Sequence, residues 1–260
     1  MKIAVCVKQV PDATVTKRID PETRRLDRSG EAALNATDLN AVEEALRIKE
    51  THGGEVVLIS LGPEKAVDSL RKALAMGADR SVLVADPAAA GSDLLGTSRV
   101  LAAVLGREAP DLVLFGQASS DGDGAVLWAA VAERLRRPVV SQVASLAVEG
   151  DSVRGKRQTE HGYDTIAAPL PAVVGVADSI NEPRYPSLKG IMGAKSKPQE
   201  TITVGDLELP PGAVGESGSA TTVLELGPPP TRGETVTLED DGSGGSAQAL
   251  FDLVVERKLL

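Results

Sequence analysis

The sequence predicts a doubly wound α/β fold with a mainly parallel sheet, an antiparallel hairpin addition and a C-terminal arm. Up to about Ala177, short apolar runs alternate with longer segments of helical spacing. The apolar runs are continuous, which is typical of strands buried on both faces of a parallel sheet. Their alternation with helices indicates βαβ units.

The elements follow one another in a regular order. The predicted strands are residues 3–7, 56–61, 82–85, 111–115 and 172–177, and the predicted helices are 38–50, 64–76, 92–107 and 125–136. Thr37 or Asp38 can cap the first helix, Gly77 ends the second, and Ser92 or Asp93 opens the third.

The pattern changes after Pro138. Residues 139–148, 152–158 and 163–168 are expected to be strands, joined by tight turns at Gly150-Asp151 and His161-Gly162. We interpret them as an antiparallel hairpin insertion that joins the edge of the sheet.

The C-terminal region has a different composition. Residues 205–245 are rich in Gly, Pro, Ser and acidic residues, as in an extended arm. Helical spacing returns at 247–259 through Leu250, Phe251, Val254, Val255 and Leu259. A short tethered helix cannot bury its own apolar face, so we expect it to pack on another chain, or alternatively on its own sheet. We therefore divide the chain into an α/β domain, 1–204, and an arm with a short helix, 205–260.

Composition excludes several classes of function. The net charge of −9 and an aromatic content of 2% argue against nucleic-acid binding. The single cysteine, Cys6, excludes a disulfide framework and a cysteine-built metal site. No apolar run is long enough to span a bilayer, and the N-terminus lacks signal-peptide features, so we expect a cytoplasmic protein without direct membrane insertion.

Residues 181–192, a few positions after the 172–177 strand, read Asn-Glu-Pro-Arg-Tyr-Pro-Ser-Leu-Lys-Gly-Ile-Met. Pro183 and Pro186 exclude an interior strand, because proline lacks a backbone N–H donor. Large apolar groups on a stiff loop are one way to present an anchor to a partner. The alternative is a crossover whose Leu188, Ile191 and Met192 fold back into the core.

Ligands of open α/β sheets bind beyond the carboxyl ends of the strands. Four segments lie at such positions: residues 6–12, 35–38, 61–63 and 116–124. The last is the strongest, because its glycines allow close backbone approach, Ser119 and Ser120 offer donors, and a helix N-terminus follows. It predicts an anion cradle suited to a nucleotide phosphate, although it matches neither the P-loop nor Gly-x-Gly-x-x-Gly. A plain polar turn is the alternative.

Candidates for catalysis are weak. His52 is expected at a helix end, His161 in a turn, and Cys6 as a small buried hydrophobe in a strand. None has a local partner arrangement, so the sequence predicts no catalytic site and no metal site.

Several motifs together resemble the β subunit of electron-transfer flavoproteins across essentially the whole chain. They are residues 7–12, residues 35–38 followed by Ala-Val-Glu-Glu-Ala-Leu at 41–46, and residues 73–79, 170–174 and 181–194. The resemblance implies an adenine-nucleotide-binding, Rossmann-like fold and a heterodimer with a larger α subunit. That subunit would hold most of a redox-active FAD, while this chain would hold a structural AMP.

The resemblance also implies site residues. The implied docking side chains for partner dehydrogenases are Tyr185, Leu188, Ile191, Met192 and Lys195, with Leu188 as the apolar anchor. The implied nucleotide contacts are Cys6, Asn35, Ala36, Thr37, Asp38, Leu61, Gly116, Gln117, Ala118, Ser119, Ser120, Asp121, Gly122, Asp123, Gly124, Ala125, Val126 and Leu127.

The sequence therefore leaves three alternative functions. The leading one is an electron carrier that takes electrons from flavin dehydrogenases, such as the acyl-CoA dehydrogenases of fatty acid oxidation. It would pass them to a membrane quinone oxidoreductase or another acceptor. The second is the β subunit of an electron-bifurcating flavoprotein with a second FAD. The third is a stand-alone nucleotide-binding stress or signalling domain.

Overall fold

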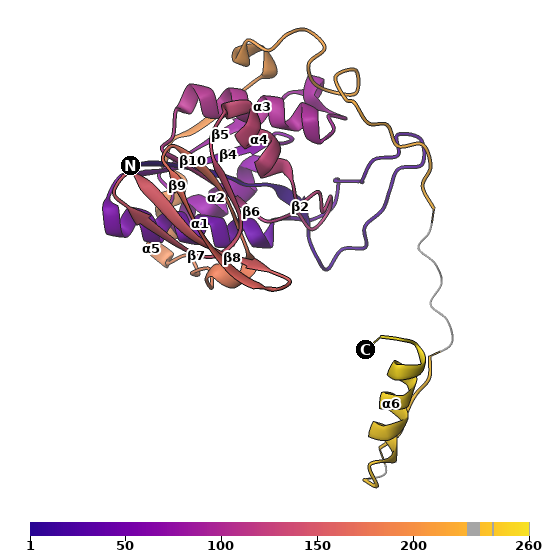
Figure 1. Ribbon diagram of the computed structural model, residues 1–260. Helices are drawn as coiled ribbons and strands as arrows, with labels where there is room; N and C mark the ends of the chain where they lie inside the picture. Colours follow the sequence, from indigo (N-terminus) through magenta and orange to yellow (C-terminus); the bar gives the residue numbers. More distant parts are fainter. Residues whose placement is uncertain (228–234, 241, 260) are drawn as a thin grey trace. The chain divides into compact units, whose positions relative to one another are not determined.

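The computed structural model of the chain describes residues 1–227, 235–240 and 242–259 (Figure 1). They divide into two compact units, Met1–Thr222 and Val223–Leu260. The first unit holds the α/β fold and every predicted nucleotide contact.

The first unit is built on a mixed sheet with nine strands among the described residues, in the order β11-β5-β4-β1-β6-β10-β7-β8-β9. All pairs from β11 to β7 are parallel, and β8 and β9 join antiparallel to β7. The strand bounds are β1 Lys2–Cys6, β4 Glu55–Leu61, β5 Arg80–Val84, β6 Leu112–Gly116, β7 Val139–Glu149, β8 Ser152–Thr159, β9 Gly162–Pro169, β10 Ala172–Val176 and β11 Gln199–Ile202. The predicted parallel sheet with a hairpin addition is confirmed.

Helices cover both faces of the sheet (Figure 1). On one face, α1 (Ala36–His52), α2 (Ala66–Met76) and α5 (Leu188–Ala194) enclose a core that includes Ile3 and Val5. On the other, α3 (Leu94–Glu108) and α4 (Leu127–Leu135) enclose one that includes Ala4 and Cys6. Successive side chains of a strand point to opposite faces, so a continuous apolar run supplies both cores.

Helix boundaries agree with the sequence signals in two places and differ in two. Asp93 caps α3 by accepting a hydrogen bond from Gly96 N (2.8 Å), and Gly77 ends α2. The predicted cap at Thr37 or Asp38 is wrong: α1 begins at Ala36, and both side chains turn to other partners. The helix predicted from residue 125 begins at Leu127, because Ala125 has a left-handed φ of 46°.

The first unit continues past the predicted boundary at residue 204. Leu207 and Val214 are buried, and Arg99 Nη1 donates to the carbonyl oxygens of Ala213 (2.8 Å) and Gly218 (3.0 Å). Residues 205–222 are therefore held on the α/β unit. That residues 205–260 function together as an arm on a partner chain stays a prediction.

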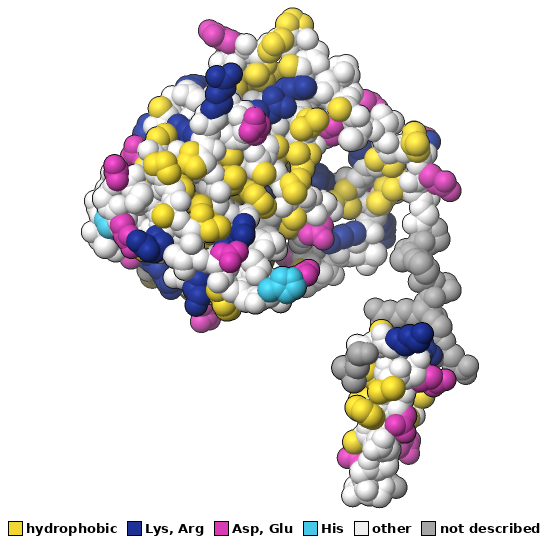
Figure 2. All heavy atoms as spheres, viewed as in Figure 1, with side chains coloured by type: hydrophobic (Ala, Val, Ile, Leu, Met, Phe, Trp, Pro, Cys, Tyr) yellow, Lys and Arg dark blue, Asp and Glu magenta, His cyan; other side chains and the backbone are white. Residues whose placement is uncertain are grey.

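The second unit contains α6 (Gly245–Glu256). Leu250, Phe251 and Val255 of this helix are each about half exposed, and hydrophobic side chains are visible along it in Figure 2. Among the described residues, no helix has both the length and the apolar character needed to cross a bilayer.

Candidate functional site

The N-terminus of α1 lies directly against the carboxyl end of β6. A Cβ atom at Gly116, the last residue of β6, would lie 2.5 Å from Asp38 Oδ1 and 2.6 Å from the carbonyl carbon of Thr37. Only glycine fits there. This contact brings residues 35–38 to the loop of residues 116–127, called the 116–127 loop below.

Asn35 and Thr37 tie this loop to α1. The Asn35 side chain, 2% exposed, donates to Ala118 O (2.9 Å) and accepts from Ser120 N (3.1 Å). Thr37 Oγ1 also donates to Ala118 O (2.7 Å). Two of the segments that the sequence singled out are therefore joined by side-chain hydrogen bonds.

Asp38 is the buried carboxyl of this region. It accepts hydrogen bonds from Lys8 N (2.7 Å) and Asn35 Nδ2 (3.1 Å). Burial raises the pKa of Asp38 to about 7, against the opposing effect of the Asn35 and Lys8 hydrogen bonds. Burial, and then the nearby Asp38, raise the pKa of the Cys6 thiol, so Cys6 is a neutral buried group as expected.

Three cationic side chains converge on the 116–127 loop. Lys8 Nζ lies 2.8 Å from Asp121 Oδ1 and 3.2 Å from Ser119 Oγ, and Lys17 Nζ donates to Ser120 O (2.7 Å). The Arg28 guanidinium pairs with the other carboxylate oxygen of Asp121. Burial alone would raise the pKa of Asp121, whose side chain is 1% exposed, but Lys8 and then Arg28 hold it well below its usual value.

Sequence reasoning missed Lys17 and Arg28. Both belong to the irregular stretch between β2 (Gln9–Pro11) and β3 (Ala32–Leu34), which has no periodicity that would place it. Lys8 carried a signal, since it follows the first strand at its carboxyl end.

The backbone of the 116–127 loop is unusual. Asp123 and Ala125 have φ angles of 41° and 46°, a region that costs non-glycine residues free energy and is concentrated at functional sites. Asp123 N donates to Ser119 O (2.8 Å), which folds the loop on itself. After it, α4 begins at Leu127 without a side-chain cap.

Leu61 completes the predicted set at the same sheet edge. It ends β4, whose register with β1 pairs Ile59 with Cys6, and it packs against the core beneath α3 and α4. The ends of β1, β4 and β6 and the start of α1 thus meet at one edge. That these residues bind a nucleotide stays a prediction.

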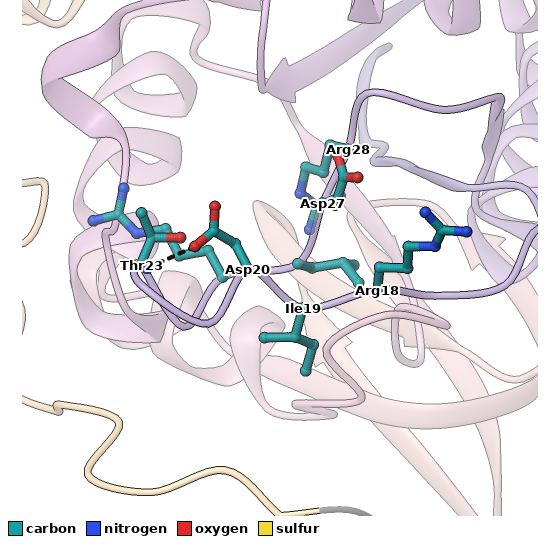
Figure 3. A pocket seen from close by; sticks show the side chains of 8 residues that line it. Arg18, Ile19, Asp20, Thr23, Asp27 and Arg28 are labelled. Atoms are coloured by element: carbon teal, nitrogen blue, oxygen red, sulfur yellow. Dashed lines mark hydrogen bonds between the residues drawn. The ribbon is translucent and has the colours of Figure 1, made fainter.

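A hollow of about 430 Å³ lies within the irregular stretch that contains Arg28 (Figure 3). Its walls are Arg18, Ile19, Asp20, Thr23 and residues 25–28, and Asp20 Oδ1 accepts from the backbone N–H groups of Glu22 and Thr23 (2.8 Å each). None of the predicted nucleotide contacts lines it, so it is a feature of the stretch itself.

The segment of residues 181–194, called the 181–194 segment below, presents apolar side chains to solvent. Tyr185 is 93% exposed, Leu188 74%, Ile191 54% and Met192 73%. The alternative in which Leu188, Ile191 and Met192 fold back into the core is therefore wrong. Lys195 is also exposed.

The two histidines occupy ordinary positions. His52 ends α1 and His161 precedes β9, and both are exposed. Within the described ranges, no group of three or more His, Cys, Asp or Glu residues could hold a metal ion.

Comparisons with known proteins give a consistent answer. A family model described as "Electron transfer flavoprotein domain" matches residues 23–207. A relative from Mycobacterium tuberculosis, "Electron transfer flavoprotein subunit beta", is 40% identical over 267 residues, which cover 99% of each chain. The protein of the same name from Thermoanaerobacterium thermosaccharolyticum is 41% identical over 89% of each chain. The "Caffeyl-CoA reductase-Etf complex subunit CarD" of Acetobacterium woodii is 41% identical over 90% of each.

Proposed function

This chain belongs to the electron transfer flavoprotein family, as a β subunit, and on that premise we propose that it is one half of a two-subunit electron carrier. In this role it turns over no substrate of its own. It binds a structural AMP, contacts an FAD held mainly by the α subunit, and docks flavin dehydrogenases.

One observation carries the nucleotide part of the proposal: Lys8 and Arg28 already surround a single anion, the Asp121 carboxylate, at the carboxyl edge of the sheet. Cationic and N–H donors of this kind also suit a phosphate group, which would lie beside Asp121 and share these donors with it. Lys8, Ser119 and the backbone of the 116–127 loop would hold the phosphate of AMP, and residues 35–38 with Leu61 would border the rest.

The redox chemistry would come from the flavin when it is bound. Residues of this chain would orient the bound groups and exclude water rather than react, since Cys6 and Asp38 are buried. We propose that α6, with its half-exposed Leu250, Phe251 and Val255, packs on the α subunit.

The 181–194 segment is proposed to dock the dehydrogenases. Exposed Leu188 is the anchor, with Tyr185, Ile191, Met192 and Lys195 around it. A small apolar anchor suits a brief encounter, in which fast release matters more than affinity. Acyl-CoA dehydrogenases of fatty acid oxidation as donors, and a quinone oxidoreductase as acceptor, belong to this proposal.

The test is Leu188→Ala in the intact α–β complex, with an acyl-CoA dehydrogenase reduced by its acyl-CoA as the donor. Leu188 would be buried on docking, so its truncation should raise KM for the dehydrogenase about tenfold or more, with flavin and AMP content unchanged. Ile19→Ala, which truncates an apolar side chain that is 51% exposed and lies outside the 181–194 segment, is the control and should leave KM unchanged. Parallel losses of flavin and activity would contradict docking and show that Leu188 is structural.

A second candidate is the β subunit of an electron-bifurcating flavoprotein. It is favoured by the 41% identity to the caffeyl-CoA reductase-Etf subunit. The two readings differ in flavin stoichiometry: two FAD per heterodimer supports bifurcation, and one FAD with one AMP excludes it.

A further inference from the structure

A polar network joins the 181–194 segment to the face of α1. The Arg184 guanidinium donates to both carboxylate oxygens of Glu43 (2.7 and 3.0 Å) and to both of Glu50 (2.5 and 3.2 Å), and Arg184 N also donates to Glu43 (3.2 Å). Glu43 is 3% exposed, so half of this network is removed from water. Bidentate pairs of this kind fix the angle as well as the distance between their groups.

A second contact lies three residues earlier in the segment. Asn40 Nδ2 donates to Asn181 O (2.8 Å), while Asn181 Nδ2 donates to Asn40 O (3.1 Å) and to Glu44 Oε2 (3.0 Å). Asn40 and Glu44 are both buried. The exchange of hydrogen bonds in both directions sets the register of the segment along the helix.

The other end of the segment is held by α2. A Cβ atom at Gly190 would lie 2.3 Å from Ala75 O, so α5 rests on the last turn of α2. Lys197 Nζ donates to the carbonyl oxygens of Leu74 (2.9 Å) and Ala78 (2.5 Å) at the end of the same helix. Exposed Tyr185 and Leu188 lie between the two attachments.

We infer that Asn181 and Arg184 are positioning residues, which hold the 181–194 segment on α1 in the geometry that a dehydrogenase recognises. The inference rests on the docking role proposed above. Stability alone would not require this arrangement, because burying a charged pair is often no better than apolar packing, whereas it does fix one geometry. A segment fixed before binding loses less conformational entropy on docking.

Arg184→Gln in the α–β complex is the direct test, with the same reduced acyl-CoA dehydrogenase as donor. KM for the dehydrogenase should rise about tenfold, because the segment loses its charged attachment, with kcat and AMP content unchanged. Arg184→Lys, which keeps the positive charge, should raise KM less than Arg184→Gln does. Arg154→Gln, which breaks the exposed pair with Glu149, is the matched control and should leave KM unchanged.

Amide hydrogen exchange provides a readout that does not depend on docking. The backbone amides of residues 182–194 should exchange faster in Arg184→Gln than in the native protein. Glu50→Gln removes only the exposed half of the network, so it should fold even if Arg184→Gln does not. It should show the same increase in exchange, but a smaller one. Faster exchange with a raised KM supports the inference.

Two outcomes separate the inference from the proposed function. If Leu188→Ala raises KM but Arg184→Gln and Glu50→Gln leave both KM and exchange unchanged, the inference is overturned while the docking role stands. If Leu188→Ala leaves KM unchanged, the docking role itself is wrong and the positioning role falls with it.

Discussion

At the scale of single residues, the proposed site depends on a glycine, Gly116, at the end of β6. Gly116 has no Cβ, and this allows the first turn of α1 to touch the end of β6 and Asn35 to reach Ala118 and Ser120. A larger residue would separate the two segments that form the predicted cradle. The geometry of the proposed nucleotide site thus depends on one close contact between Gly116 and the first turn of α1.

Gly116→Ala should therefore destabilise the protein by about 1–3 kcal/mol, because the new methyl group would overlap Asp38 and Thr37. AMP content should fall at the same time. Gly106→Ala is the matched control: a Cβ there meets nothing within 4 Å, and the helix α3 should gain about 0.5–1 kcal/mol. Denaturant unfolding measures both, and equal effects of the two variants would contradict the account.

The raised pKa of Asp38 predicts that the stability of the protein depends on pH. Its folded pKa of about 7 is above the unfolded value of 3.8, so the folded state binds the proton more tightly. The contribution of Asp38 to the free energy of unfolding is therefore highest below about pH 4 and falls as the pH rises to about 7.

Asp38→Asn should remove this dependence. Relative to the native protein, the variant should become more stable by up to about 1.4 kcal/mol for each pH unit across that window, whatever its stability at pH 4. Denaturant unfolding at several pH values measures the difference. A difference that stays constant with pH would show that folding does not raise the pKa of Asp38.

At the scale of elements, most strands of the large sheet could be predicted from continuous apolar runs, and the long helices could be predicted from their helical spacing. The 3–7 run, for example, has both faces apolar, and the structure buries Ile3 and Val5 on one side and Ala4 and Cys6 on the other. The elements that were missed lack such a signal. Strand β11 reads Gln-Glu-Thr-Ile and, within the part of the chain that the structure describes, pairs with β5 alone, while α5 carries its large apolar side chains outward.

Lys195 and Lys197, the two lysines that follow the last turn of α5, lie in different surroundings. Lys195 is among the implied docking side chains, whereas Lys197 donates to carbonyl oxygens at the end of α2, and burial lowers its pKa. Lys195 remains exposed. Of these two lysines, Lys195 is the one whose side chain can contact a partner.

Lys197→Met should accordingly lower the free energy of unfolding by about 1–3 kcal/mol, because the carbonyl oxygens of Leu74 and Ala78 lose their charged donor. Lys195→Met should change it by less than about 0.5 kcal/mol. Denaturant unfolding of the two variants side by side checks this, and a reversed order would show that the contact of Lys197 contributes nothing.

At the scale of the whole molecule, topology explains why the site could be predicted in part. Parallel strands end at one edge, so Cys6, Leu61 and Gly116 had to lie near each other once the fold class was correct. Arg28 and Lys17 could not be placed, because they reach the 116–127 loop from a stretch without periodic structure. The network of Arg184 with Glu43 spans 141 positions and carries no local signal.

The central claim is that this chain is a subunit that holds an adenylate and a flavin-bearing companion. The most direct measurement is native mass spectrometry of the tagged chain purified from the cells that produce it, followed by mass analysis of the released ligands. The account predicts a heterodimer with a larger chain that releases one FAD and one AMP. A stable, colourless monomer that releases no adenine nucleotide would contradict it.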